Sequence, residues 1–231
     1  MNESLLNTMT FSLPHRRWRW YAVFMDRDQN HPVAASVGSN SFLTMLQNFT
    51  CSPLPFSWFL TETSVQPMMQ SLRKSAGNWK RVHAAFMRKH SLSPVSVQAL
   101  VDSPSFCSAV KSARVRHSLA CWHVLCASRN IDFAHARVVM QVDQSLDRMP
   151  MSPLKGEPFL PCATSHGSYW YPPLQRCLSS TELLSLQGLS PQEQERLGLH
   201  LVPSAMRRNL AGNAFSVPVA TAVCIAAILT S

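Results

Sequence analysis

The sequence contains few glycines, few charged residues and no long apolar run, and each of these absences limits the structures that the chain can form. Glycine occurs 7 times against 16 prolines, which indicates many stiff connections. Charged residues make up only 14% of the chain, but 46% of it is hydrophobic, which excludes wholesale disorder and allows a sizeable core. The C-terminal apolar run at 217–230 has 14 residues, whereas a bilayer span takes about 20. We therefore expect a buried C-terminal helix there and no membrane partner.

The cysteines lack the pattern of a disulfide framework or of a metal site. There are seven, an odd number, with no C-x-x-C pair, and the first residues "MNESLLNTMT" show no basic-then-apolar leader. Reduced thiols in the cytosol or nucleus are the simplest interpretation. The segment "HSLACWHVLC" places His117, Cys121, His123 and Cys126 near one another. On one continuous helix these four side chains do not converge on a tetrahedron, so we expect cysteines packed in a helix core and no metal site.

Acidic residues are also scarce. Lys and Arg total 21 against 12 Asp and Glu, a net charge of +9, which favours polyanionic partners such as DNA, RNA or an anionic membrane surface. Apolar residues spaced by three or four predict helices over 67–90 and 105–130, each with basic residues on its other face. Such faces can lie along a phosphate backbone or be ordinary solvated faces. A run of β-branched residues predicts a strand at 135–143.

Three short segments carry the most specific patterns. "SLPHRRWRWYAVF" at 12–24 packs three arginines, two tryptophans and a tyrosine together. "RCLSSTELLSLQGL" at 176–189 predicts a helix capped by Ser179 and Glu182 and ended by Gly188. "LAGNAFSVPVATAVCIAAIL" at 210–229 predicts a tight Gly-Asn turn before an apolar helix.

These segments resemble three conserved motifs of the cytosine-5 DNA methyltransferases. The segment at 176–189 is similar, without a gap, to motif IX, R-x-L-T-x-x-E-x-x-x-L-Q-G-F. "LAGNAFSVPVA" resembles motif X, in which G-N-[SA]-V/F precedes small and apolar residues. "LPHRRWRWYAV" resembles motif VIII, L/V-P-Q-x-R-x-R-x-Y-x-V, with His15 in place of the usual Gln. The three segments lie in the family's order.

The resemblance implies an enzyme that flips a cytosine out of the duplex and methylates it from S-adenosylmethionine after thiolate attack at C6. His15, Arg17 and Arg19 would contact the flipped base and a nearby phosphate, and Asn213 and Ala214 would line the methionine end of the cofactor site. Residues 1–26 would be a motif VIII strand segment, 27–175 a target-recognition region, and 176–231 the motif IX and X helices. DNA would be the partner and the nucleus the location.

The family's catalytic motifs are missing from this sequence. It holds no F-x-G-x-G cofactor loop, no P-C-Q nucleophile motif and no E-N-V. Pro161 and Cys162 follow motif VIII, where the family's nucleophile does not sit, so no catalytic residue is assigned. The expected fold is therefore α+β: an incomplete C-terminal part of an S-adenosylmethionine-dependent methyltransferase fold, with a helical recognition-like middle and no complete doubly wound sheet.

Three hypotheses remain open. In the first, the chain is a cytosine-5 DNA methyltransferase fragment that is inactive alone, holds only part of the cofactor site, and binds DNA or complements an N-terminal methyltransferase half. In the second, it is a non-enzymatic basic protein that binds DNA or RNA. In the third, it is a degenerate product with no selected activity.

Overall fold

The computed structural model describes residues 2–23, 41–61, 78–107, 110–149, 151–152, 154 and 156–230. These residues form two compact units. Unit 1 consists of Met1–Phe59, Cys162–Ser165 and Ser180–Ser231, and unit 2 of Leu60–Pro161 and His166–Ser179. The N-terminal and C-terminal segments of the chain therefore belong to the same unit.

Unit 1 begins with an antiparallel hairpin. β1 (Asn2–Asn7) pairs with β2 (Trp18–Val23) so that Leu5 lies opposite Trp20, and the 3-10 turn η1 (Thr8–Thr10) follows β1. Successive side chains of a strand point to opposite faces. Tyr21 packs inward, whereas Leu5, Trp18 and Trp20 are exposed on the other face. β2 confirms a strand in the arginine-rich segment, with its tryptophans on the face away from the inward-facing residues.

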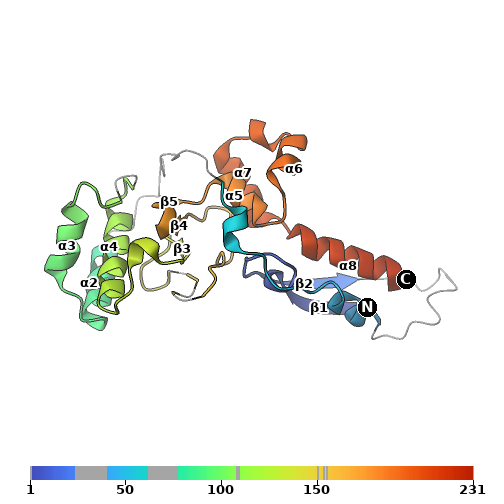
Figure 1. The fold of residues 1–231 in the computed structure, drawn as a ribbon, viewed down its shortest axis with the longest axis horizontal. Helices are drawn as coiled ribbons and strands as arrows, with labels where there is room; N and C mark the ends of the chain where they lie inside the picture. The colour runs from blue at the N-terminus through green and yellow to red at the C-terminus, as the bar shows by residue number, and fades with distance from the viewer. Residues whose placement is uncertain are drawn as a thin grey trace. The chain divides into compact units, whose positions relative to one another are not determined.

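The C-terminal helix supplies the core beneath this hairpin. α8 (Val217–Thr230) packs against α1 (Ser41–Gln47), and their buried apolar residues meet Phe11 (Figure 1). The other members of this core are Phe42, Leu46, Val219, Ala222, Val223 and Ala226. The predicted apolar helix at the C-terminus is thus confirmed, although its outer face leaves Ile228 72% exposed.

The other helices described in unit 1 are short. They are η2 (Phe56–Phe59), α5 (Ser180–Ser185), α6 (Pro191–Arg196), η5 (Leu199–Leu201) and α7 (Ser204–Asn213). The helix predicted in the 176–189 segment is confirmed: α5 begins at Ser180, directly after the expected cap residue, and a turn over residues 186–188 ends it. Leu183 and Leu186 are buried. Gly188 ends the turn at φ +93°, where an added Cβ would lie 2.6 Å from Pro218 Cδ, so both the conformation and the space require glycine.

α6 begins with a capping box. The capping box is formed by Ser190 and Glu193 at the start of α6: the Ser190 hydroxyl accepts from the Glu193 N–H, and the Glu193 carboxylate accepts from the Ser190 N–H. The pair expected at Ser179 and Glu182 stays a prediction, and Glu182 is fully buried.

Unit 2 holds three main helices, α2 (Trp79–Lys89), α3 (Pro94–Asp102) and α4 (Ala113–Ala127), with α4 contacting both others (Figure 1). Ser93 caps α3 by accepting from the Ser96 N–H, and Pro94 occupies the first turn. The residues before 78 in the helix predicted over 67–90 lie outside the described residues. The helix predicted over 105–130 was too long, because its first residues form turns and α4 begins at Ala113.

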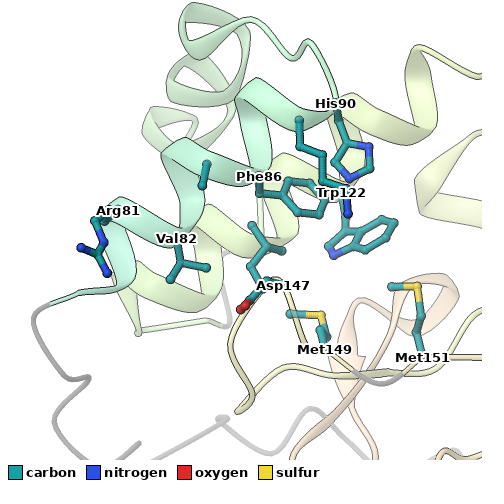
Figure 2. Close-up of a pocket in the computed structure, with 11 residues that line it drawn as sticks. Arg81, Val82, Phe86, His90, Trp122, Asp147, Met149 and Met151 are labelled. Carbon is teal, nitrogen blue, oxygen red and sulfur yellow. The ribbon is translucent and has the colours of Figure 1, made fainter.

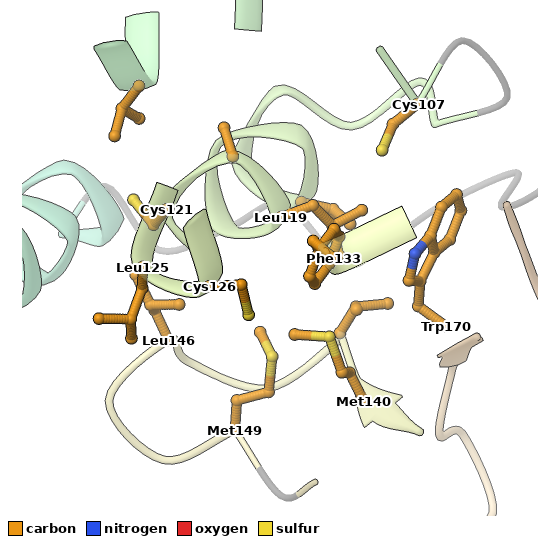
Figure 3. Close-up of a cluster of buried hydrophobic side chains, with 14 of the residues drawn as sticks. Cys107, Leu119, Cys121, Leu125, Cys126, Phe133, Met140, Leu146, Met149 and Trp170 are labelled. Carbon is orange, nitrogen blue, oxygen red and sulfur yellow. The ribbon is translucent and has the colours of Figure 1, made fainter. Parts of the chain in front are cut away.

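One face of α2 lines a pocket with the 146–151 segment (Figure 2). Beside it, a second core fills unit 2, in which Leu119, Leu125 and Cys126 of α4 meet Met140 and Trp170 (Figure 3). A small antiparallel sheet of β3 (Met140–Gln141), β4 (Tyr169–Tyr171) and β5 (Arg176–Cys177) closes this core. The strand predicted over 135–143 was also too long: η3 (Phe133–His135) precedes it and only two residues pair. The 3-10 turn η4 (Pro172–Leu174) joins β4 to β5.

The described residues thus combine helices with small sheets, none of them closed, and this confirms the α+β class. The boundaries of the units differ from the predicted domains. Residues 41–59, expected in a recognition region beginning at 27, belong to unit 1 because Phe42 and Leu46 pack against α8.

Among the described residues, no one helix has both the length and the hydropathy of a bilayer span. Ser204–Asn213 and Val217–Leu229 reach those limits together as a pair bent by 41°.

Candidate functional site

The segment that resembles motif VIII lies at the centre of a buried polar cluster in unit 1. The imidazole of His15 is completely buried. Its Nε2 accepts a hydrogen bond from the backbone N–H of Ala163 at 3.1 Å, and its Nδ1 lies 3.1 Å from the side-chain amide of Gln187. Gln187 belongs to the segment that resembles motif IX, so His15 joins two of the three motif-like segments directly.

The protonation of His15 follows from these contacts. Burial, and after it the nearby Arg17 and Arg19 cations, lower the pKa of His15 to about 3, so the ring is neutral at pH 7. A backbone N–H can only donate, which makes Nε2 the acceptor and places the single proton of the ring on Nδ1. The amide orientation that satisfies this ring directs the Gln187 oxygen toward Nδ1–H.

Arg17 joins the same cluster to the third motif-like segment. Its side chain is 4% exposed. Nη1 donates to the carbonyl oxygens of Ala163 at 3.2 Å and Gly212 at 3.0 Å, and Nη2 also donates to Gly212 at 3.0 Å. A planar guanidinium can bind two carbonyls in this way, and a lysine could not. Arg17 thus holds the end of α7 to the 162–165 segment.

Gly212 explains why the contact is so close. A Cβ placed on Gly212 would lie 2.1 Å from the backbone nitrogen of Ser165 and 2.3 Å from the carbonyl carbon of Thr164. Only glycine allows this approach of helix and chain. Gly212 and Asn213 form the last turn of α7, and the break before α8 covers residues 214–216. The tight Gly-Asn turn predicted from the sequence is therefore wrong, because both residues lie in the last turn of α7.

The remaining predicted site residues lie nearer to solvent. Arg19 on β2 is partly exposed and donates to the carbonyl of its neighbour Trp18 at 3.1 Å. Asn213 is exposed and bonds to Asn209 one turn earlier, and Ala214 is half-buried. His15 and Arg17 are thus bound to protein groups, whereas Arg19 and Asn213 are accessible. The substrate and cofactor roles of all five residues stay predictions.

Cys162 lies beside this cluster. It is exposed, and its Sγ is 3.8 Å from the carbonyl oxygen of Ala163, the residue that both His15 and Arg17 bind. This proximity was not visible in the sequence, because Cys162 follows Arg17 by 145 residues and His15 by 147.

The histidine and cysteine group of α4 is divided between different environments. Cys121 and Cys126 are buried in the core of unit 2, and burial raises the pKa of the Cys121 thiol to about 12. His117 lies 3.6 Å from Cys121 Sγ through Nδ1, whereas His123 packs edge-on against two phenylalanine rings. No group of three or more metal-ligating side chains occurs among the described residues.

The basic side chains of the two predicted helix faces differ in exposure and in hydrogen bonding. On α2, the basic side chains Lys80, Arg81, Arg88 and Lys89 are all exposed. On α4, Arg114 donates to carbonyls of residues 142–144, and Arg116 donates to the carbonyls of Val101 and Ser103 at the end of α3. Arg114 and Arg116 are therefore bound inside unit 2, whereas the four cations of α2 are exposed and can reach a partner.

Comparison with protein-family models finds no match to this chain, and comparison with curated proteins finds none either.

Proposed function

We propose that the chain is the C-terminal part of a cytosine-5 DNA methyltransferase, which binds DNA and contributes to methyl transfer together with a half that carries the catalytic cysteine. The observation that supports this most is the convergence in unit 1. His15, Gln187 and Gly212 come from the three motif-like segments and are connected through His15 and Arg17. Three resemblances scattered by chance over 200 residues have no reason to meet in one buried polar cluster.

Within this proposal the residues divide by accessibility. Arg19 is the arginine of the motif VIII pair that can reach a flipped cytosine or its phosphate, since Arg17 is already bound to two carbonyls. Asn213 and Ala214, at the break between α7 and α8, would line part of an S-adenosylmethionine site that the other half completes. The bound cofactor would supply the methyl group. Nuclear residence follows from the DNA substrate.

The first test uses the chain alone and a DNA duplex with a target cytosine. A cytosine in a mismatch costs less to unstack and flip, so a protein that holds a flipped base binds the mismatched duplex more tightly than the matched one. We expect Arg19→Gln to remove that preference. Arg16→Gln is the matched control, because Arg16 is an exposed neighbour outside the buried cluster. Equal binding of both duplexes by the unaltered chain would argue against a base-holding site.

The second test asks for methyl transfer. The chain is mixed with an N-terminal half of a cytosine-5 DNA methyltransferase that ends ahead of motif VIII, and transfer from labelled S-adenosylmethionine to duplex cytosine is measured. We expect activity only when both parts are present, and a loss of about a hundredfold with Arg19→Gln. If the chain neither binds duplex at low salt nor restores transfer to any such half, the proposal is rejected.

A second candidate function rests on α2. Its four exposed cations within ten residues suit a phosphate backbone without base contacts. Under this alternative, affinity falls steeply with salt, Lys80→Gln and Arg88→Gln weaken binding, and matched and mismatched duplexes bind equally. The comparison of the two duplexes therefore separates the two functions.

A further inference from the structure

Unit 2 contains a pocket that the proposed function does not use. It has a volume of about 500 Å³, within the range of small-molecule sites. Its floor is apolar and includes Phe86 of α2, Trp122 of α4, and Met149 and Met151 of the segment beyond β3. Figure 2 shows the Trp122 indole between Phe86 and the two methionines, and the Phe86 and Trp122 rings are 5.5 Å apart. Aromatic walls of this kind suit a flat apolar ligand, and methionine side chains adapt to its shape.

The indole N–H of Trp122 does not face the open part of the pocket. Its Nε1 is buried and has no hydrogen-bond partner among the described residues. A ligand therefore meets the rings of Phe86 and Trp122 at the floor, and a polar group of the ligand has to be bound at the rim.

The rim of the pocket adds positive charge. Arg81 and Lys89 lie two turns apart on the same face of α2, about 12 Å along its axis, and both line the pocket. Neither forms an ion pair among the described residues. The one acidic lining residue, Asp147, accepts from Ser145 and lies 3.8 Å from Arg148. The Asp147 carboxylate is thus engaged on its own segment and leaves the rim cationic.

A histidine at the rim does not alter this balance at neutral pH. Burial, and after it the neighbouring Lys89 and Arg129, lower the pKa of His90, so its ring is uncharged at pH 7. Among the described residues that line the pocket, the charged side chains at pH 7 are then Arg81, Lys89 and Asp147.

We propose that this pocket binds a small aromatic carboxylate, with the ring between Phe86, Trp122 and the methionines and the carboxylate at the cationic rim. One carboxylate oxygen accepts from the nearer of Arg81 and Lys89. No residue of the unit 1 cluster takes part, so the proposal is independent of methyl transfer.

The test uses three probes with one ring system: naphthoate, naphthylmethanol and naphthylmethylammonium. Binding to the full chain is followed by NMR through the indole N–H signal of Trp122. We expect naphthoate to bind most tightly, naphthylmethanol less tightly and the cation least, with the Trp122 signal shifted by the ring current of the bound naphthyl group. If the cation binds as well as naphthoate, or if the Trp122 signal does not move, the proposal is wrong.

Variants of α2 distinguish binding in the pocket from general attraction by the positive charge of the helix. The pair Arg81→Gln and Lys89→Gln should weaken naphthoate about fivefold and leave naphthylmethanol unchanged. The pair Lys80→Gln and Arg88→Gln removes the same charge from the same helix at positions that do not line the pocket, and should leave both probes unchanged. Equal losses in the two pairs would show attraction by net charge alone. Ala85→Trp, at an exposed lining position, should block all three probes without unfolding the unit.

Discussion

The buried His15 ring predicts an acid sensitivity of unit 1 that a single substitution removes. The pKa of His15 is about 3 in the folded chain, against 6.5 for an ordinary histidine. Between these two pH values the unfolded chain binds a proton that the folded chain does not, so stability falls as the pH falls. Above pH 7 both states are neutral and the contribution is constant. From pH 7 to pH 5, this proton uptake lowers the free energy of unfolding by about 2 kcal/mol.

His15→Gln is the informative change. Glutamine can accept from the Ala163 N–H through its oxygen and donate to Gln187 through its amide, as the neutral ring does, but it has no proton to gain. At pH 7 we expect this variant to lose only about 1 kcal/mol, and His15→Leu about 3 kcal/mol, because leucine leaves two buried polar groups without partners. Between pH 7 and pH 5, the free energy of unfolding should fall by about 2 kcal/mol more in the unaltered chain than in the His15→Gln variant.

The assay is amide hydrogen exchange of unit 1 at several pH values, read at Val217, whose N–H donates to the Gln187 carbonyl at 2.8 Å. Other buried histidines contribute equally to the stability of both proteins, so they do not affect the difference in stability between them. His83 in unit 2, whose pKa burial lowers to about 4, is the same in both proteins. Nitrogen chemical shifts of the imidazole give an independent check, because they distinguish a proton on Nδ1 from one on Nε2. The reasoning fails if His15 titrates near pH 6.5, if Nε2 carries the proton, or if the two proteins lose stability in parallel.

Three further changes test the packing of unit 1, each by urea unfolding. Gly212→Ala should destabilise it by about 3 kcal/mol, because the new Cβ meets backbone that cannot move away; Asn213→Ala, one residue on and exposed, should stay within about 0.5 kcal/mol of the unaltered chain. Arg17→Met should cost about 3 kcal/mol through the loss of three hydrogen bonds to buried carbonyls, whereas Arg16→Met should cost less than about 0.5 kcal/mol. Ser190→Ala should cost about 1 kcal/mol by removing the capping box of α6, and a smaller loss for Ser190→Thr than for alanine would attribute the effect to the hydroxyl.

Periodicity and turn chemistry predicted part of this fold from the sequence. The apolar spacing located α4, α8 and the described part of α2, and Gly188 was placed as a helix end. α3 was missed although Ser93 and Pro94 signal its start, and α6 was missed although Ser190 and Glu193 have capping-box spacing. Both signals are local, and both helices are short. β1 has no comparable signal, because "NESLLN" becomes a strand only by pairing with β2.

The fate of the arginines could not be predicted in the same way. Arg114 and Arg116 were assigned to a solvated or phosphate-binding face because they oppose the apolar side of the helix. Their partners are carbonyls of the 142–144 loop and of the C-terminal end of α3, at Val101 and Ser103, which the periodicity of one helix does not reveal. A long side chain can turn back over its helix to reach such groups. The basic character of a helix face is therefore known only when the neighbouring loops are placed.

The same consideration divides the two arginines of the motif VIII segment. Residues 17 and 19 lie on one face of an extended chain, so the sequence alone does not decide which of the two arginines contacts a DNA substrate. In the structure, Arg17 is hydrogen-bonded to both the 162–165 segment and α7, whereas Arg19 is accessible. A loss of DNA binding in an Arg17 variant would therefore follow from disruption of unit 1 and would say nothing of base recognition. Arg19, compared with Arg16, is the position at which a loss of binding with unchanged stability identifies contact with DNA.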